Sequence, residues 1–404
     1  MTQAGFGAVR PGTDLGRHAR ELQRVHDAVL SGSRPPAPPR TLVARSWRRV
    51  LGMGLDPDSA NGRGTPSAAE LARRRETSPL ALVIDELRAV LTSAADSATY
   101  LMVVTDADGV VLWREGSARV RMTADRLGFT EGARWTERAV GTNAIGTALA
   151  EAAPVELFSA EHFEHQQHPW YCTAAPLHDP RTGELLGVVD LSGPALTLHP
   201  ALGALVESAV RLAELSLWRR HQERLERLRR DTEHVVAAVP GPLLVVDDHG
   251  WVAHHAGIAV RDRIEVPRAD RPLAVPGLGL CLPERVGERG WLVRPGATPT
   301  AISACLAEDA TGTPVLTLAS GSGPWRTTLT RRHAEILRLL HGAGPAGLTA
   351  SQLSTAVFGD TAHVVTVRAE VSRLRRTLGA LVATNPYRLA DGVTLTVGPP
   401  DYPC

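Results

Sequence analysis

Apolar residues recur at helical spacing near the front of the chain. Residues 14–30 carry a partial apolar stripe and predict a short helix, and a second short helix is predicted over 42–50. The stretch Ser33–Pro39 between them is rich in proline and cannot be crossed by a helix. Residues 1–78 are therefore expected to form a helical segment with a Pro-rich linker.

From Pro79 the pattern changes to short apolar runs separated by turns. A helix is predicted over 79–96, and two hairpins follow, closed by the turns Asp106–Gly109 and Asp179–Glu184. The order helix, hairpin, helices, hairpin, helix predicts an antiparallel sheet with helices on one side over residues 79–215. The predicted strands cover residues 100–105, 110–113, 174–177 and 185–191.

A long helix is predicted over 201–238, and its character changes halfway along. The first part has a broad apolar face, whereas residues 221–231 are dominated by Arg and Glu around Leu225 and Leu228. Two interpretations of the connecting segment 216–240 stay open: pairing with a partner helix in a dimer, or an exposed helix with i,i+4 charge pairs. The apolar face consists of Leu202, Leu205, Val206, Ala209, Leu212 and Leu215.

Residues 241–322 are rich in Pro and Gly and carry a strand–turn–strand signal around Asp247–Gly250. Further short apolar runs occur at 290–294 and 314–318. We expect a small α+β domain of the PAS type here.

The last segment, residues 325–404, predicts three helices followed by a β-ribbon, which is the winged-helix arrangement. The first helix is Leu329–Leu340, and the second opens at Thr349 with the T-x-x-Q pattern of a capping box. The third covers 364–378, and two turn signals after it separate three short strands.

The predicted helix 364–378 has two distinct faces at 100° per residue. Its core stripe is Val364, Val367, Val371, Leu374 and Leu378. The opposite side combines small residues, which let a helix sit deep in the major groove, with arginines, which contact guanine edges or phosphates. The candidate DNA-binding residues are Val365, Arg368, Ala369, Ser372, Arg373, Arg375 and Arg376, with Arg388 on the ribbon.

Charge supports this interpretation. The 404 residues carry a net charge of only +1, yet the part from Trp325 onward has nine Arg against five acidic residues, a net charge of +4. A helical domain with solvated arginines is the alternative. No apolar run reaches the ~18 residues of a membrane span, so we expect a cytoplasmic protein with no membrane partner.

Lysine is absent from the chain, which excludes a P-loop, a Schiff-base lysine and a kinase-type ATP site. The sequence also has no HExxH and no G-x-S-x-G motif, so neither an enzyme activity nor a cofactor is expected.

A dense run of motifs lies in the middle of the chain, at Gly128–Leu149, Ala160–Phe163, Trp170–Pro176 and Leu186–Gly193. With Ser46-Trp47 and Gly54–Pro57 upstream, these motifs resemble the GAF sensor domain of regulators similar to the acetoin-catabolism activator, over about residues 40–215. The C-terminal run T-V-R-A-E-V-S-R-L-R-R-T-L-G followed by P-Y-R-L resembles the winged helix of OmpR-type response regulators.

This chain departs from the acetoin-type family in one respect. Members of that family carry an ATPase that remodels sigma-54 polymerase, and its G-x-x-x-x-G-K-[ST] loop needs a lysine. The chain therefore looks like a shortened regulator, of the sort seen in actinobacteria, with a winged helix in place of the ATPase.

The GAF resemblance implies a small-molecule pocket over one sheet face, under the connecting helices. Aromatic side chains would supply apolar area, and Thr142 and Asn143 would supply polar contacts. The alternative is that the aromatics are core and the Gly-Thr-Asn run is a helix N-cap. The implied lining residues are Phe129, Trp135, Thr142, Asn143, Phe163, Trp170 and Cys172.

Two other groups of residues each have a structural and a functional interpretation. His162, His165 and His168, with Cys172 nearby, are metal-ligand types, but their spacing drifts around a helix, so surface histidines and no metal site are expected. The run Arg45–Arg49 is either a nucleic-acid patch or a solvated helix face with one packed Trp, and we favour the second.

The sequence as a whole predicts a ligand-responsive transcription regulator. A small molecule of unknown identity in the GAF domain would change how the winged helices of a homodimer bind double-stranded DNA, and RNA polymerase is a further expected partner. The open alternative is a signalling adaptor whose winged helix binds a sigma factor or polymerase instead of DNA.

Overall fold

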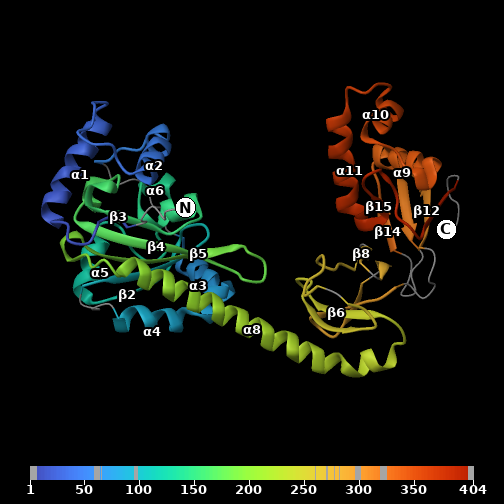
Figure 1. The fold of residues 1–404 in the computed structure, drawn as a ribbon, viewed down its shortest axis with the longest axis horizontal. Coiled ribbons are helices and arrows are strands. Elements are labelled where there is room, and N and C mark those ends of the chain that lie inside the picture. Colours follow the sequence, from blue (N-terminus) through green and yellow to red (C-terminus); the bar gives the residue numbers. More distant parts are fainter. Residues whose placement is uncertain are drawn as a thin grey trace. The chain divides into compact units, whose positions relative to one another are not determined.

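The computed structural model describes residues 7–58, 64, 66–94, 99–259, 261–269, 272–276, 278–281, 283–295, 302–318 and 325–398. The chain is an α+β protein that divides into two units, residues 1–221 and 222–404 (Figure 1). None of the described helices combines the length and apolar character needed to cross a bilayer.

The first unit contains one antiparallel sheet with the strand order β2-β1-β5-β4-β3. Both predicted hairpins are confirmed, since β1 pairs with β2 and β4 pairs with β5. The central pairing of β1 with β5 joins the two hairpins. The strands are β1 (Leu101–Asp106), β2 (Val111–Gly116), β3 (Val155–Phe158), β4 (Trp170–His178) and β5 (Leu185–Pro194).

Helices and 3-10 turns fill the rest of this unit. The predicted helix over 79–96 is split into η1 and α4, and its residues 95–96 lie outside the described residues. The elements are α1 (Leu15–Leu30), α2 (Thr41–Gly52), α3 (Ala68–Thr77), η1 (Pro79–Leu82), α4 (Ile84–Ala94), α5 (Ala118–Asp125), α6 (Glu137–Val140), α7 (Ala144–Glu151), η2 (Ser159–Glu161), η3 (His165–Gln167) and η4 (Ala195–Thr197).

The helices cover both faces of the sheet, so the expectation of helices on one side was wrong. In β1, Met102 and Val104 pack into an apolar cluster with α4, whereas Leu101 and Val103 pack into a second cluster with α2 and α7. Figure 1 shows α4 and α8 (Leu202–Ala238) below the sheet and α1, α2 and α6 above it. The uninterrupted apolar run of β1 is the pattern of a strand buried on both faces.

The long helix α8 begins and ends within one residue of its predicted bounds. Its apolar face is narrower than predicted, because Leu212 and Leu215 are 52% and 63% exposed. Further along, Leu228 packs against the cluster of Leu243 and neighbouring strand residues. Neither interpretation of this segment from the sequence included that contact.

Residues 241–295 form a small sheet with the order β10-β11-β6-β7, beside the separate pair β8-β9. Their described part holds no helix, so the α+β character expected for 241–322 is not seen there. The strands are β6 (Leu243–Asp247), β7 (Val252–Ala256), β8 (Leu273–Val275), β9 (Gly279–Cys281), β10 (Glu284–Val286) and β11 (Gly290–Val293).

The last part of the chain is a three-helix module with a sheet of order β14-β13-β12-β17. Strand β17 pairs in parallel with β12, which the sequence analysis had grouped with the preceding segment. The sheet therefore moves the expected boundary at 325 back to residue 302. The elements are β12 (Ile302–Glu308), β13 (Pro314–Leu318), β14 (Trp325–Thr328), α9 (Arg331–Ala343), η5 (Gly344–Ala346), α10 (Ala350–Phe358), α11 (Val364–Leu378), η6 (Gly379–Leu381), β15 (Val382–Ala383), β16 (Arg388–Leu389) and β17 (Val393–Val397).

Local signals in this module agree with the sequence. The capping box is present at α10, where Thr349 Oγ1 accepts from the Gln352 amide and the Gln352 side chain accepts from the Thr349 amide. The predicted core stripe of α11 is buried from Val367 to Leu378, and Val364 is half-buried.

Candidate functional site

Helix α2 lies against the face of the sheet that carries the predicted ligand residues. Ser46 Oγ donates to the Glu137 carboxylate at 2.6 Å, and the Trp47 indole N–H donates to the Glu161 carbonyl at 3.1 Å. Arg49 also donates to Glu137, at 2.7 Å. The face expected to be solvated is therefore a contact face, although the prediction of one packed Trp holds.

The predicted aromatic residues share one buried cluster on this face. The rings of Phe129 and Trp135 are in contact with centroids 4.1 Å apart and planes tilted by 42°, and Phe163 and Trp170 belong to the same cluster. Cys172 is partly buried at its edge. A surface hollow of about 540 Å³ lies along α8, but none of the predicted ligand-binding residues lines it.

Thr142 and Asn143, the two polar residues predicted to contact a ligand, form hydrogen bonds within the protein. Asn143 caps α7, since its Oδ1 accepts from the Gly146 amide at 2.8 Å and its Nδ2 donates to the Gly141 carbonyl at 2.9 Å. Thr142 Oγ1 lies 2.7 Å from Ser46 Oγ. Gly141 has a φ of 76°, and a Cβ there would lie 2.5 Å from a ring carbon of Phe163. The geometry of this run is that of a helix N-cap.

A polar group that sequence reasoning missed lies on the same face, in the middle of β5. Ser192 Oγ donates to Asp190 Oδ2 at 2.5 Å, and Cys172 Sγ lies 3.0 Å from Ser192 Oγ. Asp190 Oδ1 is buried and has no hydrogen-bond partner among the residues that the structure describes. Burial raises the pKa of Asp190 to about 7 and also raises the pKa of the Cys172 thiol. An acidic residue inside the apolar run V-V-D-L was the available signal.

The sequence predicted surface histidines over residues 162–168, and this prediction is wrong for His162. His162 is fully buried, its Nδ1 lies 2.9 Å from the Ser159 carbonyl, and burial lowers its pKa to about 4. His165 and His168 are half-buried against His26 of α1, with ring centroids 5.0 and 4.7 Å from it. Burial lowers the pKa of His168 to about 3 and lowers that of His26 as well.

The predicted DNA-binding residues of α11 form one exposed side of that helix. All seven are exposed, and Val365 is 78% exposed. Arg368 and Arg376 make no ion pair within the described part of the chain, so their charges are available to a ligand. Ala369 and Ser372 lie between them and add little bulk.

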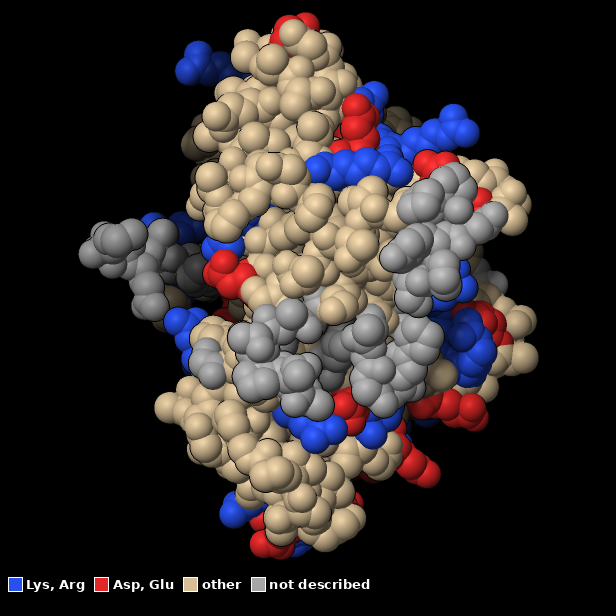
Figure 2. Space-filling view, turned by 90° about the vertical axis from the view of Figure 1, so that its right-hand side faces the viewer, with Lys and Arg blue, Asp and Glu red and all other residues tan. Residues whose placement is uncertain are grey.

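The other predicted DNA-binding arginines of this module form ion pairs or hydrogen bonds within the protein. Arg373 pairs with Glu370, and Arg375 Nε donates to the Val382 carbonyl at 3.1 Å. Arg388 is half-buried and pairs with Asp391 at 2.5 Å. Figure 2 shows a face on which arginines lie in small groups beside acidic side chains. The charge on that face is mixed, not uniformly basic.

Comparison with known proteins places the chain in a family. It is 31% identical over 399 residues to the 47.3 kDa protein in the thcA 5′ region of Rhodococcus erythropolis, covering 97% of this chain and 74% of that protein. The chain belongs to the family of this Rhodococcus protein. Residues 20–214, which include α1, α2 and the five-stranded sheet, match the family described as the MimR N-terminal domain.

Other similarities are confined to part of the chain. The acetoin dehydrogenase operon transcriptional activator AcoR of Bacillus subtilis is 34% identical over 227 residues, covering 56% of this chain and 37% of AcoR. The chain thus spans little more than a third of the length of that relative. Among solved structures, the E. coli DhaR(N)–DhaL complex matches with a TM-score of 0.43 and 17% identity, over 63% of this chain and 99% of that one.

Proposed function

We propose that this chain is a ligand-responsive transcription regulator that acts by binding DNA. In this proposal residues 79–215 form a GAF-type sensor covered by α1 and α2, and residues 302–398 form a winged helix. Residues 243–293 follow α8 in the sequence and form a small module of strands. The transcriptional-activator name of the Bacillus relative supports the regulatory role.

The observation that carries the DNA-binding part is the exposed side of α11. It presents Arg368 and Arg376, which form no ion pair with any described residue, with Ala369 and Ser372 between them. The helix follows α10 after a short turn at Gly359. In a helix-turn-helix pair the second helix enters the major groove, and here that helix is α11. Its small central residues and flanking arginines suit this position. Because the chain has no lysine and hence no P-loop, its proposed output is direct occupancy of DNA.

The sensor part of the proposal rests on the buried face beneath α2. Aromatic side chains there provide apolar area. Asp190 Oδ1, which has no hydrogen-bond partner among the described residues, is a polar atom that a hydroxyl of a small molecule would satisfy in either protonation state of the carboxyl. Thr142 and Asn143 stay proposed lining residues, although a ligand contact there would compete with the cap of α7.

A homodimer is part of the same proposal. Leu212 and Leu215 leave an apolar stretch of α8 exposed in the single chain, and a second copy of the helix would cover it. Ligand binding beneath α2 would then alter how the two winged helices address a two-fold DNA site.

DNA binding is tested with the full chain and fragments of the DNA upstream of its own gene, by fluorescence anisotropy at several salt concentrations. We expect saturable, salt-sensitive binding that Arg376→Ala weakens about five- to a hundredfold. Arg338→Ala, which removes an exposed arginine paired with Glu308 on the sheet side, serves as the matched control and should bind like the wild type.

Two results would count against direct DNA binding. Equal affinities of the wild type and Arg376→Ala would remove α11 as the reading helix. Absence of DNA binding together with capture of RNA polymerase or a sigma factor would favour the adaptor alternative.

A further inference from the structure

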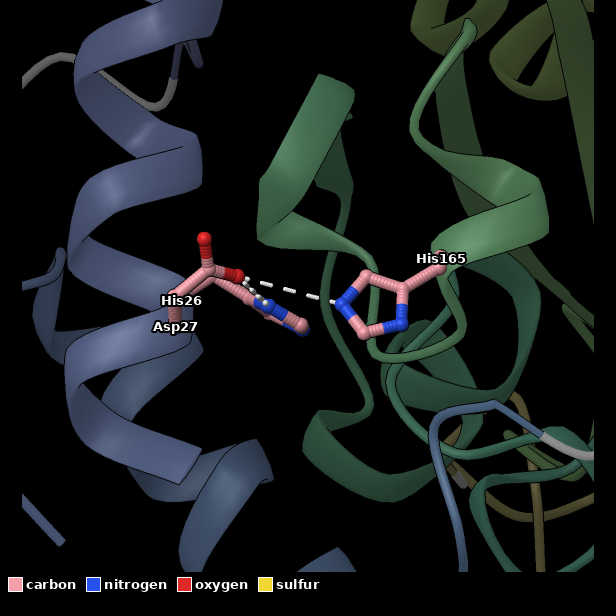
Figure 3. A group of neighbouring side chains, drawn as sticks. All are labelled: His26, Asp27 and His165. Atoms are coloured by element: carbon pink, nitrogen blue, oxygen red, sulfur yellow. Dashed lines mark hydrogen bonds and ion pairs between the residues drawn. The ribbon is translucent and has the colours of Figure 1, made fainter. Parts of the chain in front are cut away.

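Three side chains of metal-ligand type meet where α1 packs against the segment that follows β3 (Figure 3). His26 and Asp27 are consecutive on α1, and His165 begins η3. One potential ligand atom from each residue lies within 4.8 Å of the other two. Asp27 Oδ1 is 3.4 Å from His26 Nδ1 and 3.8 Å from His165 Nε2, so the carboxylate lies between the two rings.

In each imidazole, the nitrogen that is not beside Asp27 lies within hydrogen-bond distance of an acceptor. His26 Nε2 lies 3.0 Å from the Phe163 carbonyl oxygen, and His165 Nδ1 lies 2.7 Å from Asp58 Oδ1. A carbonyl and a carboxylate only accept, so in the neutral rings these nitrogens carry the protons. The lone pairs of His26 Nδ1 and His165 Nε2 are therefore left for the side of Asp27. Metal-bound histidines show the same orientation by a carbonyl or carboxylate on the opposite nitrogen.

With both rings neutral, three electron-pair donors face one another, and a cation among them would offset their repulsion. Asp27 Oδ1 also accepts from Gln23 Nε2 at 2.8 Å, which helps to hold the carboxylate in this position. Ligands at ~2.1 Å from a tetrahedral metal ion are ~3.4 Å apart, and Asp27 Oδ1 lies 3.4 and 3.8 Å from the two imidazole nitrogens. Two imidazoles and one carboxylate suit first-row divalent ions such as Zn²⁺ and leave further positions for water. The side chains of His165 and Asp27 are 36% and 55% exposed, so an ion can enter from solvent.

We propose that His26, Asp27 and His165 bind one first-row divalent cation, of the Zn²⁺ type, which fastens α1 to the segment after β3. The expected effect is structural. His26 also packs edge-on against Trp47 of α2, so fixing His26 would hold both N-terminal helices over the sheet. The inference does not depend on DNA binding or on an effector.

The test uses the untagged full chain after treatment with a chelator and dialysis. Co²⁺ is titrated with visible absorption as the readout, and Zn²⁺ is titrated by calorimetry and by thermal unfolding. We expect one ion per chain and a higher unfolding midpoint with Zn²⁺. Asp27→Asn and His165→Gln should each weaken binding at least tenfold, since each removes one ligand and leaves the partly exposed site otherwise intact.

His341→Ala is the matched control, because this exposed histidine lies in the last turn of α9. It should bind Co²⁺ and Zn²⁺ like the wild type. The proposal is overturned if the wild type binds neither ion at one equivalent. It is equally overturned if Asp27→Asn and His165→Gln, both with wild-type circular dichroism, retain wild-type affinity.

Discussion

Arg49 of α2 and Glu137 of α6 form a two-pronged ion pair: Nε and Nη2 of the arginine each donate to one oxygen of the carboxylate at 2.7 Å. Glu137 is only 5% exposed, and Ser46 Oγ and Thr147 Oγ1 donate to the same carboxylate. The pair joins an N-terminal helix to the start of the run that was identified as GAF-like.

Replacing Arg49 with alanine should destabilise the first unit by about 2–3 kcal/mol, because a buried carboxylate would lose its charged partner. The measurement is urea unfolding followed by circular dichroism. Arg48→Ala is the control, since within the described part of the chain this neighbouring exposed arginine bonds only to the Ala44 carbonyl of its own helix. Similar losses for both variants would mean that the Glu137 contact contributes nothing specific.

Stability should fall as pH rises from about 4 to 7 because of Asp190. Its carboxyl stays protonated in the folded state up to a pKa of about 7, whereas in the unfolded chain it ionises near ~3.9. Unfolding therefore releases a proton in this window, and the folded state is penalised progressively until pH 7 and fully above it. Asp190→Asn should exceed the wild type in free energy of unfolding by up to about 4 kcal/mol at pH 8, and match it near pH 4. A pH-independent difference between the two proteins would contradict this origin.

Asn143→Ala should cost about 1–2 kcal/mol, because the first turn of α7 loses its side-chain cap and the Gly141 carbonyl loses a donor. Asn143→Ser keeps a capping oxygen and should recover roughly half of that loss. Thermal unfolding of the two variants separates the contributions. If alanine unfolds at the wild-type temperature, the cap is dispensable and the residue is free to serve a ligand.

The double substitution Leu212→Glu and Leu215→Glu should convert the proposed dimer to a monomer, since it places two charges on the exposed apolar stretch of α8. Light scattering coupled to size-exclusion chromatography gives the mass directly. Leu196→Glu, at a 65% exposed leucine outside α8, is the control and should leave the mass unchanged. A wild type that elutes as a monomer at micromolar concentration would rule out this dimer.

Short-range patterns made much of the fold predictable. The hairpins β1–β2 and β4–β5 were found from apolar runs and the turns between them. The buried stripe of α11 followed from helical spacing alone, as did the exposure of Arg376 on the opposite side. In each case the signal lies within about a dozen neighbouring residues, where the period of the side chains fixes the buried face.

Contacts between distant parts of the chain could not be predicted in this way. Nothing near His26 indicates that His165 will lie beside it, and nothing in β12 indicates that β17 will pair with it. Leu212 shows the complementary error. It fits a helical apolar stripe, but the apolar cluster against which α8 packs includes Val206, Ala209 and Ala213 and leaves Leu212 52% exposed. Amphipathic spacing shows which faces are apolar but does not name the surface that covers them.

The parallel pairing of β17 with β12 determines how this module should be cut out for separate study. A recombinant fragment that starts at residue 325 would lack β12 and would leave the backbone groups of β17 and the side chain of Leu395 without their partners. An open strand edge of this kind invites aggregation between fragment molecules. A fragment that starts a few residues before Ile302 retains the whole sheet and should remain monodisperse at concentrations suitable for spectroscopy.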